Sequence, residues 1–186
     1  LCKHAPQHFE SYHDEMEYLV EHKGRNNLIK NLVNDLEGNT LVLFNYVEKH
    51  GEPLYELINS TIDPERKLFF VHGGTDVEDR EEVRQITETE SNAIIVASYG
   101  TFSTGINIKR LHNIVFASPS KSRIRNLQSI GRVLRKGEGK DIATLYDIAD
   151  DIGGQNYTLK HLNERVNIYN DENFKYEVIK VNLRAS

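Results

Sequence analysis

Short apolar runs alternate with segments of helical periodicity along most of this chain. The apolar runs are four to six residues long and fall at 40–44, 68–71, 93–97, 113–117 and 143–148. A short, nearly continuous apolar run is typical of a strand that is buried on both faces of a parallel sheet. The sequence therefore predicts five buried strands.

The segments between these runs predict helices. Apolar residues recur at helical spacing just before Gly38-Asn39, a dipeptide that favours a helix C-terminus: Leu28, Ile29, Leu32, Val33 and Leu36. We expect the first forty residues to be mostly helical, and further helices at about 47–58, from a cap at Thr75 or Asp76 to about 87, from about 122, and at 158–168. Residues 174–179 alternate and predict a final strand.

Strands that alternate with helices indicate an α/β protein. The expected fold is a doubly wound, mostly parallel sheet with helices on both faces. Ligands of such sheets bind beyond the carboxyl ends of the strands. The loops that follow Phe44, Val71, Ala97, Ala117 and Ile148 are therefore the candidate functional loops.

Composition sets limits on the class of protein. The chain has 186 residues, 38% hydrophobic and 27% charged, which is ordinary for a soluble globular domain with one core. No apolar run is long enough for a membrane span, and the single cysteine, Cys2, fits a reducing cytoplasm. Leu1 in place of methionine suggests a piece of a longer protein. His4, His8 and His13 match no usual ligand spacing, so no metal site is expected on this chain.

Charge is distributed unevenly along the chain. Residues 109–140 hold nine Lys or Arg and one acid, a local charge of about +8 within a chain of net charge −5. The set includes Lys109, Arg110, Lys121, Arg123 and Arg125. This asymmetry predicts one face that binds a polyanion.

The most informative motif lies within this basic segment. Residues 128–135 have the pattern Q-x-x-G-R-x-x-R, and on a helix Gln128, Arg132 and Arg135 would share one face. Two guanidiniums aimed together suit phosphate oxygens, and Gly131 would let another surface approach closely. An ordinary helix with a solvated basic face is the alternative reading.

A second motif follows the third predicted strand. Residues 98–107, from Ser98 through Thr101 and Gly105 to Asn107, are rich in hydroxyl groups and glycine. Short hydroxyls and free backbone N–H groups are common phosphate ligands. An ordinary polar loop is the alternative for this segment taken alone.

In their order and spacing, these motifs resemble the signature motifs of superfamily 2 helicases. Residues 128–135 resemble the last motif and residues 104–107 the penultimate one, while residues 41–46 and His72-Gly73-Gly74 with Arg80 resemble two earlier elements. The resemblance spans roughly residues 28–150 and implies the second RecA-like lobe. It divides the chain into a helical lead-in (1–39), the RecA-like domain (40–150) and a C-terminal helix and strand extension (151–186).

The resemblance also implies roles for individual residues. Arg135 would be the arginine finger on the γ-phosphate of ATP, with Arg132 and Gln128 beside it, and Gly105, Asn107 and Gly131 would contact the nucleotide. Residues implied to bind nucleic acid are Asn45, His72, Gly73, Ser98, Thr101 and Arg123. The loop after the third strand is about one residue longer than in many members, so either Ser98 or Thr101 could hold the DNA phosphate.

Elements of a complete motor are missing from this sequence. The nearest match to a P-loop, at Gly139-Lys140, has Leu134 in place of the first glycine and Asp141 in place of the hydroxyl residue. The P-loop and the acids that bind Mg²⁺ would belong to an N-terminal RecA-like lobe of the same protein. Asp147, Asp150 and Asp151 lie at the end of a strand and are interpreted as capping or solvated residues in preference to a metal site.

The expected function is therefore that of a DNA motor. The implied partner is branched or forked DNA, remodelled in recombination and replication-fork rescue, with no membrane involved. A translocase that does not separate strands shares the same motor core. The alternatives outside the family are a RecA-like module that only docks nucleic acid or protein, and another doubly wound protein such as a flavodoxin-like receiver. A receiver would need acids where Asn45 and His72 stand.

Overall fold

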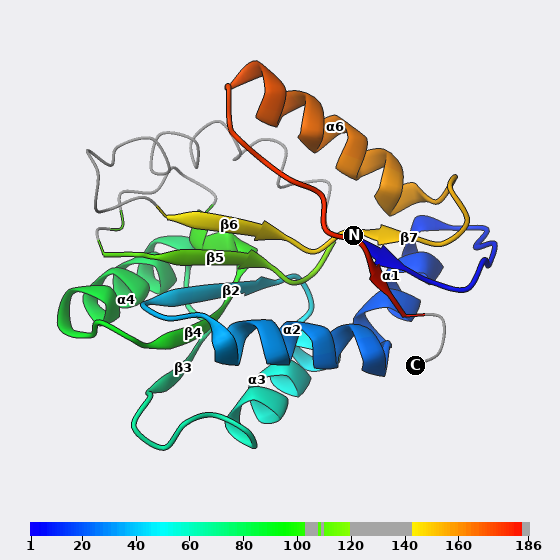
Figure 1. The fold of residues 1–186 in the computed structure, drawn as a ribbon. Coiled ribbons are helices and arrows are strands. Elements are labelled where there is room, and N and C mark those ends of the chain that lie inside the picture. The colour runs from blue at the N-terminus through cyan, green and yellow to red at the C-terminus, as the bar shows by residue number, and fades with distance from the viewer. Residues whose placement is uncertain (103–107, 109, 120–142, 184–186) are drawn as a thin grey trace.

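The computed structural model describes residues 1–102, 108, 110–119 and 143–183 (Figure 1). Its centre is a five-stranded, wholly parallel sheet with the strand order β3-β4-β2-β5-β6. The strands are β2 (Thr40–Phe44), β3 (Leu68–Val71), β4 (Ile94–Ser98), β5 (Asn113–Phe116) and β6 (Thr144–Asp147). Each of the five predicted strands is confirmed to within one residue at either end.

The helices agree with the predicted periodicity. They are α1 (Tyr12–Glu21), α2 (Lys23–Asp35), the π-helical turn η1 (Val47–Gly51), α3 (Glu52–Asn59), α4 (Asp76–Thr89), the 3-10 turn η2 (Tyr99–Phe102) and α6 (Tyr157–Asp171). The cap predicted at the start of α4 is formed by Thr75, whose hydroxyl accepts from the Glu78 N–H while the Glu78 carboxylate accepts from the Thr75 N–H. The helix predicted from about residue 122 lies outside the described residues.

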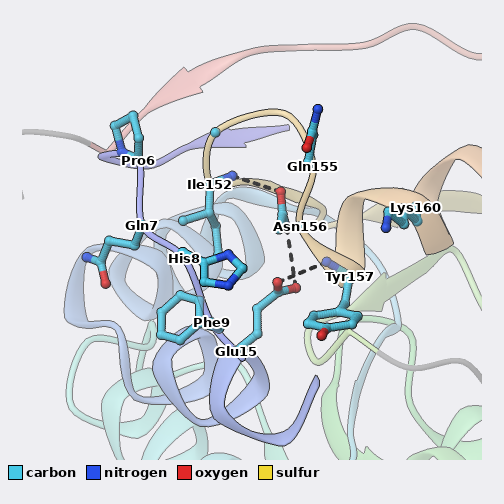
Figure 2. Close-up of a pocket in the computed structure, with 11 residues that line it drawn as sticks. Pro6, Gln7, His8, Phe9, Glu15, Ile152, Gln155, Asn156, Tyr157 and Lys160 are labelled. Atoms are coloured by element: carbon cyan, nitrogen blue, oxygen red, sulfur yellow. Dashed lines mark hydrogen bonds between the residues drawn. The ribbon is translucent and has the colours of Figure 1, made fainter. Parts of the chain in front are cut away.

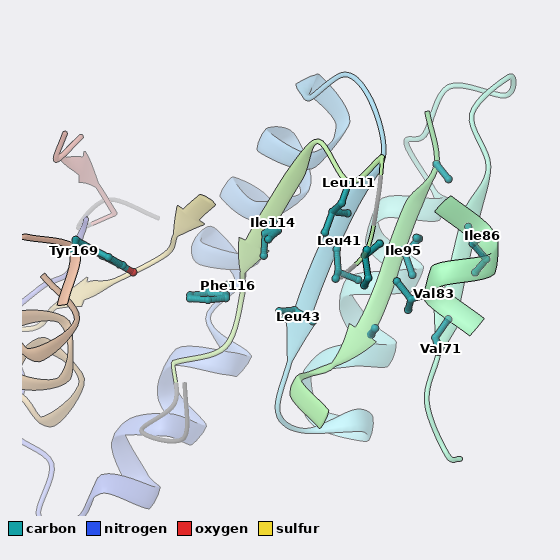
Figure 3. Close-up of a cluster of buried hydrophobic side chains, with 13 residues drawn as sticks. Leu41, Leu43, Val71, Val83, Ile86, Ile95, Leu111, Ile114, Phe116 and Tyr169 are labelled. Carbon is teal, nitrogen blue, oxygen red and sulfur yellow. The ribbon is translucent and has the colours of Figure 1, made fainter. Parts of the chain in front are cut away.

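Helices cover both faces of the sheet, as a doubly wound fold requires. Alternate residues of β2 point to opposite faces, so Leu41 and Leu43 belong to one cluster and Val42 and Phe44 to the other. The first cluster packs against α4 and α6 (Figure 3), and the second packs against α2 and α3. Helices therefore cover both faces, and the ends of the strands are the places where a ligand can bind.

A small second sheet joins the two ends of the chain. Strand β1 (Cys2–Lys3) lies between β7 (Asp150–Asp151) and β8 (Val181–Asn182) and is parallel to both. Figure 1 shows β7 just beyond the arrowhead of β6, next to the N-terminus. No strand forms at 174–179, so that prediction is wrong. Strand β1 is only two residues long, and it pairs with residues 181–182, further along the chain.

The C-terminal extension (151–186) contains four Tyr or Phe residues, and two of them pack against the core of the main sheet. Tyr169 is buried in the first cluster and Phe174 packs partly against it, while Tyr157 and Tyr176 remain exposed. In the part of the chain that the structure describes, no helix is long and apolar enough to cross a membrane.

Candidate functional site

Three of the predicted nucleic-acid residues meet at the carboxyl edge of the sheet. Asn45 directly follows β2, His72 directly follows β3, and Ser98 is the last residue of β4. Strand β4 lies between the other two, with Phe44 paired to Ser98 and Val71 paired to Ala97. The parallel register therefore places these three residues along one continuous edge.

His72 and Gly73 form the exposed end of this row. The His72 ring lies against that of Phe70, with the ring centroids 4.3 Å apart. Gly73 has φ of +93° and no other group within 4 Å of the place where a side chain would begin. Glycine is needed there for its backbone conformation, since an L residue is strained at this φ. The turn is open to an incoming ligand.

The two candidate hydroxyls of the β4 loop differ in access. Ser98 is partly exposed, whereas Thr101 is fully buried and its hydroxyl donates to the Ser98 carbonyl at 3.0 Å. Gly100 lies between them, and a Cβ there would come within 2.1 Å of an Asp76 carboxylate oxygen at the start of α4. Ser98 is thus the more accessible hydroxyl for a DNA phosphate, and the role of both residues stays a prediction.

Asn45 ties the loop after β2 to the loop after β5. Its backbone N–H donates to the Ser118 hydroxyl at 3.1 Å, and its side-chain amide donates to the Pro119 carbonyl at 2.9 Å. The other predicted site residues lie outside the described residues: Gly105, Asn107, Arg123, Gln128, Gly131, Arg132 and Arg135. Pro119 lies nine residues before Gln128 in the sequence, so Asn45 binds the chain ahead of the arginine motif.

Sequence reasoning missed the hydrogen bonds that converge on residues 117–119. The Ala117 carbonyl accepts from Arg25 at 2.6 Å, and the Ser118 carbonyl accepts from the Tyr99 hydroxyl at 2.6 Å. The His50 ring Nδ1 lies 2.5 Å from the Ser118 hydroxyl. No motif could have revealed this set, because its members are scattered over α2, η1 and two loops.

His50 is held as a neutral imidazole. Burial, reinforced by the positive charge of Arg25, lowers the pKa of His50 to about 3. Its Nε2 lies 3.0 Å from the side-chain oxygen of Asn26, whose amide nitrogen donates to the Val20 carbonyl. Because Asn26 can only accept at that oxygen, Nε2 of His50 carries the proton and Nδ1 accepts from the Ser118 hydroxyl.

A buried ion pair lies next to the loops that follow β5 and β6. Arg25 and Asp150 are both fully buried, with Nε of Arg25 2.9 Å from one carboxylate oxygen of Asp150 and His4 Nε2 2.8 Å from that oxygen. Burial by itself would raise the pKa of Asp150, but the charge of Arg25 and the hydrogen bond from His4 outweigh it and lower that pKa. The interpretation of Asp150 as a capping or solvated residue is therefore wrong.

Asp147 is likewise engaged in an ion pair. Both of its carboxylate oxygens bind Arg165 of α6, at 2.6 and 3.0 Å, and one also accepts from the Tyr169 hydroxyl. Asp151 pairs with Lys3. Sequence spacing could not show these pairings, since the partners come from α2, α6 and β1.

A cavity of about 580 Å³ lies outside this edge, between residues 6–9 and the start of α6 (Figure 2). At its floor the Glu15 carboxylate accepts from the N–H groups of Tyr157 and Thr158, at 2.9 and 2.7 Å. Glu15 thereby caps α6 from another helix. The lining of this cavity contains none of the predicted site residues.

Comparisons with known proteins decide the family. Residues 24–137 match the family model described as the helicase conserved C-terminal domain. The chain belongs to this family. The resemblance to the second RecA-like lobe of superfamily 2 helicases is thereby confirmed.

The chain is also similar to individual proteins and solved structures. The chain is 39% identical, over 93% of its length, to the ATP-dependent DNA helicase UvsW of Enterobacteria phage T4. The crystal structure of T4 UvsW superposes with a TM-score of 0.77 at 36% identity, covering 98% of this chain and 41% of that one. The C-terminal domain of the DEAD-box protein Dbp5 has a TM-score of 0.58 at 11% identity, with 98% and 88% of the chains covered, and shares the fold alone. This chain spans 37% of the length of UvsW.

Proposed function

We propose that this chain is the second motor lobe of an ATP-dependent DNA helicase or translocase that remodels branched DNA in recombination and replication-fork rescue. The observation that carries the proposal is the 39% identity to UvsW, whose name describes an ATP-dependent DNA helicase. The proposed division is a helical lead-in (1–39), the RecA-like domain (40–150) and an extension (151–186). An N-terminal lobe of the same protein would supply the P-loop.

Arg135 is the proposed arginine finger of this lobe. Arg132 would lie beside it, Gln128 would orient groups in the same cleft, and Gly105, Asn107 and Gly131 would contact the nucleotide. An arginine that reaches the transferring phosphoryl group is worth about a thousandfold or more in turnover. When bound between the lobes, ATP supplies that group, and Mg²⁺ is assigned to acids of the other lobe.

The proposed DNA grip is the row at the carboxyl edge of the sheet. It consists of Asn45, His72, Gly73, Ser98 and Thr101, together with Arg123. The exposure of His72 and Gly73 and the partial exposure of Ser98 support this role. Contacts of this kind go to phosphates, so binding should be sequence-independent and should weaken with salt.

The decisive experiment measures DNA-stimulated ATP hydrolysis by the longer protein that carries this chain, with Arg135→Ala compared with the wild type. We expect a loss of turnover of about a thousandfold with nucleotide binding largely retained. Arg84→Ala is the matched control, because Arg84 is partly exposed on α4 and pairs only with Glu81 and Glu88 among the ion pairs of the described residues.

Each outcome bears on a different claim. Unchanged turnover in Arg135→Ala would reject the finger role. A wild-type protein that hydrolyses no ATP would favour the docking-module alternative. Equal stimulation by linear duplex and by forked or four-way DNA would contradict the branched-DNA part of the proposal while leaving the motor intact.

A further inference from the structure

A hydrogen-bonded set surrounds two buried residues, His50 and Ser118, at the carboxyl edge. We name it the Ser118 junction, and its five members are Asn26, Asn45, His50, Tyr99 and Ser118. Its direction follows from the neutral His50 ring. Nε2–H of His50 donates to Asn26, the Ser118 hydroxyl donates to Nδ1 of His50, and the Asn45 N–H donates to the Ser118 oxygen. The Tyr99 hydroxyl completes the set by donating to the Ser118 carbonyl.

A serine hydroxyl bound to a histidine, with an asparagine behind it, is also an arrangement that activates a nucleophile. Ser118 and His50 are both 0% exposed, so no substrate can reach the hydroxyl. The junction therefore acts through position and not through chemistry at Ser118.

The junction joins three loops that the proposed function uses separately. Asn45 begins the loop after β2, Tyr99 begins the loop after β4, and Ser118 precedes the segment of the arginine motif. Ser118 uses both its hydroxyl and its carbonyl to hold the other two loops. In a buried, low-dielectric setting a displaced loop would leave these groups unsatisfied, so the loops can be expected to shift together.

We propose that the Ser118 junction couples DNA contact at the loops after β2 and β4 to the position of the arginine motif, with Ser118 and His50 as positioning residues. This inference rests on the proposed function and deepens it. DNA held at Asn45 and Ser98 fixes the two loops, and the junction transmits that constraint to the start of the segment that carries Arg132 and Arg135. DNA stimulation of hydrolysis is the expected consequence.

The test compares Ser118→Ala and Thr40→Val in the longer protein. Thr40 is the matched control, because its buried hydroxyl hydrogen-bonds to the Gly38 carbonyl at the opposite end of β2. Ser118→Ala should lower DNA-stimulated turnover about tenfold, within the usual range of coupling between sites. Turnover without DNA and the half-saturating DNA concentration should stay within about twofold of the wild type, since no contact to DNA or nucleotide is removed.

A double-mutant cycle separates a coupled unit from independent losses. His50→Phe retains a ring of similar size without its nitrogens, and the His50→Phe/Ser118→Ala pair should lower stimulated turnover no further than either single change. If Ser118→Ala does not fold, Tyr99→Phe provides a milder cut, because it removes one hydroxyl and keeps the ring. Thr40→Val should leave the stimulation ratio (turnover with DNA divided by turnover without DNA) unchanged, even if its melting temperature falls as far as that of Ser118→Ala.

The failures are distinguishable. A stimulation ratio in Ser118→Ala equal to that in Thr40→Val would overturn the coupling and leave the motor proposal standing. The same holds for Tyr99→Phe where it replaces Ser118→Ala. A wild-type protein with no DNA-stimulated hydrolysis would overturn both.

Discussion

Each end of the central sheet has one buried polar residue that ties several loops together. At the amino end, the Asn39 amide donates to the carbonyls of Glu90 and Arg110, at 2.7 and 3.0 Å, and its oxygen accepts from the Ala93 N–H at 2.9 Å. At the carboxyl end, Ser118 is bound by Asn45, His50 and Tyr99. Both residues are fully buried.

The difference between the two ends lies in their partners. The Asn39 amide binds backbone groups, which must be satisfied wherever loops are buried. Ser118 is also bound by two side chains, those of His50 and Tyr99, in addition to backbone groups. The direction of this series depends on the tautomer of His50. Burial and satisfied hydrogen bonds therefore do not by themselves mark function. The loops that are joined, and the groups that join them, distinguish the two ends.

The largest effect on the free energy of unfolding is expected at Arg25, near the carboxyl end of the sheet. Arg25→Met leaves Asp150 as an uncompensated buried charge and removes the donor to Ala117, so unfolding of this chain should become easier by about 3–5 kcal/mol. Arg66→Met is the counterpart at the amino end, where a half-buried Arg66 donates to the carbonyls of Asn92, Val33 and Gly38. We expect roughly 1–2 kcal/mol there, since no buried charge is stranded.

Urea unfolding of both variants measures the difference. Similar losses in the two would mean that the Arg25–Asp150 pair contributes no more than the hydrogen bonds from Arg66 to backbone carbonyls do. The loss measured for Arg66→Met thus serves as the reference for the loss measured for Arg25→Met.

The next effect is expected at Asn39 itself. Asn39→Ala leaves the buried Ala93 N–H and two loop carbonyls without their partner, which should cost roughly 3 kcal/mol in the free energy of unfolding. Turnover of the surviving folded protein should keep its normal stimulation by DNA, because the amino end holds none of the described residues of the proposed grip. Loss of stimulation in this variant would remove the distinction between the two ends.

The sequence predicted the sheet better than it predicted the junction. Runs such as 40–44 and 93–97 predict strands because a strand buried on both faces needs apolar side chains throughout, and this is a local property. The small sheet of β1, β7 and β8 was not predicted. Its strands are two residues long and gain their stability from partners that are distant in the chain.

The site divides in the same way. Asn45, His72 and Ser98 are named by the resemblance to helicase motifs, and their common position follows because parallel strands bring their ends to one edge, a rule that needs no side-chain coordinates. Arg25, His50 and Asp150 were missed as a group, because their roles depend on three-dimensional proximity and burial. A buried charge or a neutral histidine has no signature in the order of residues along a chain.

A moderate effect of pH is expected from His50. Its pKa in the folded chain is about 3, below the value of about 6.5 expected in the unfolded chain, so the unfolded state binds the proton first as the pH falls. Stability should therefore rise with pH between about 3 and 6.5, and acidification from pH 6.5 to 4.5 should cost roughly 2 kcal/mol through this residue. The gap in unfolding free energy between the wild type and His50→Phe should narrow by that amount over the same interval.

Unfolding titrations of the two proteins at several pH values check this expectation. The depressed pKa of Asp150 acts in both proteins alike, so it cancels in the difference. Parallel curves would show that folding does not lower the pKa of His50, which would contradict this expectation.

The smallest effect, and the finest test of the comparison, is expected at Tyr99. Tyr99→Phe removes the hydroxyl that donates to Ser118 and keeps the ring, which packs edge-on against Phe116 at 5.7 Å between centroids. The cost to folding should be about 1 kcal/mol, the net worth of one hydrogen bond, as judged by urea unfolding. A purely structural contact would predict an unchanged DNA stimulation ratio in the longer protein. A measurable fall in that ratio, at so small a cost in stability, would indicate that the hydroxyl transmits loop position to the arginine segment.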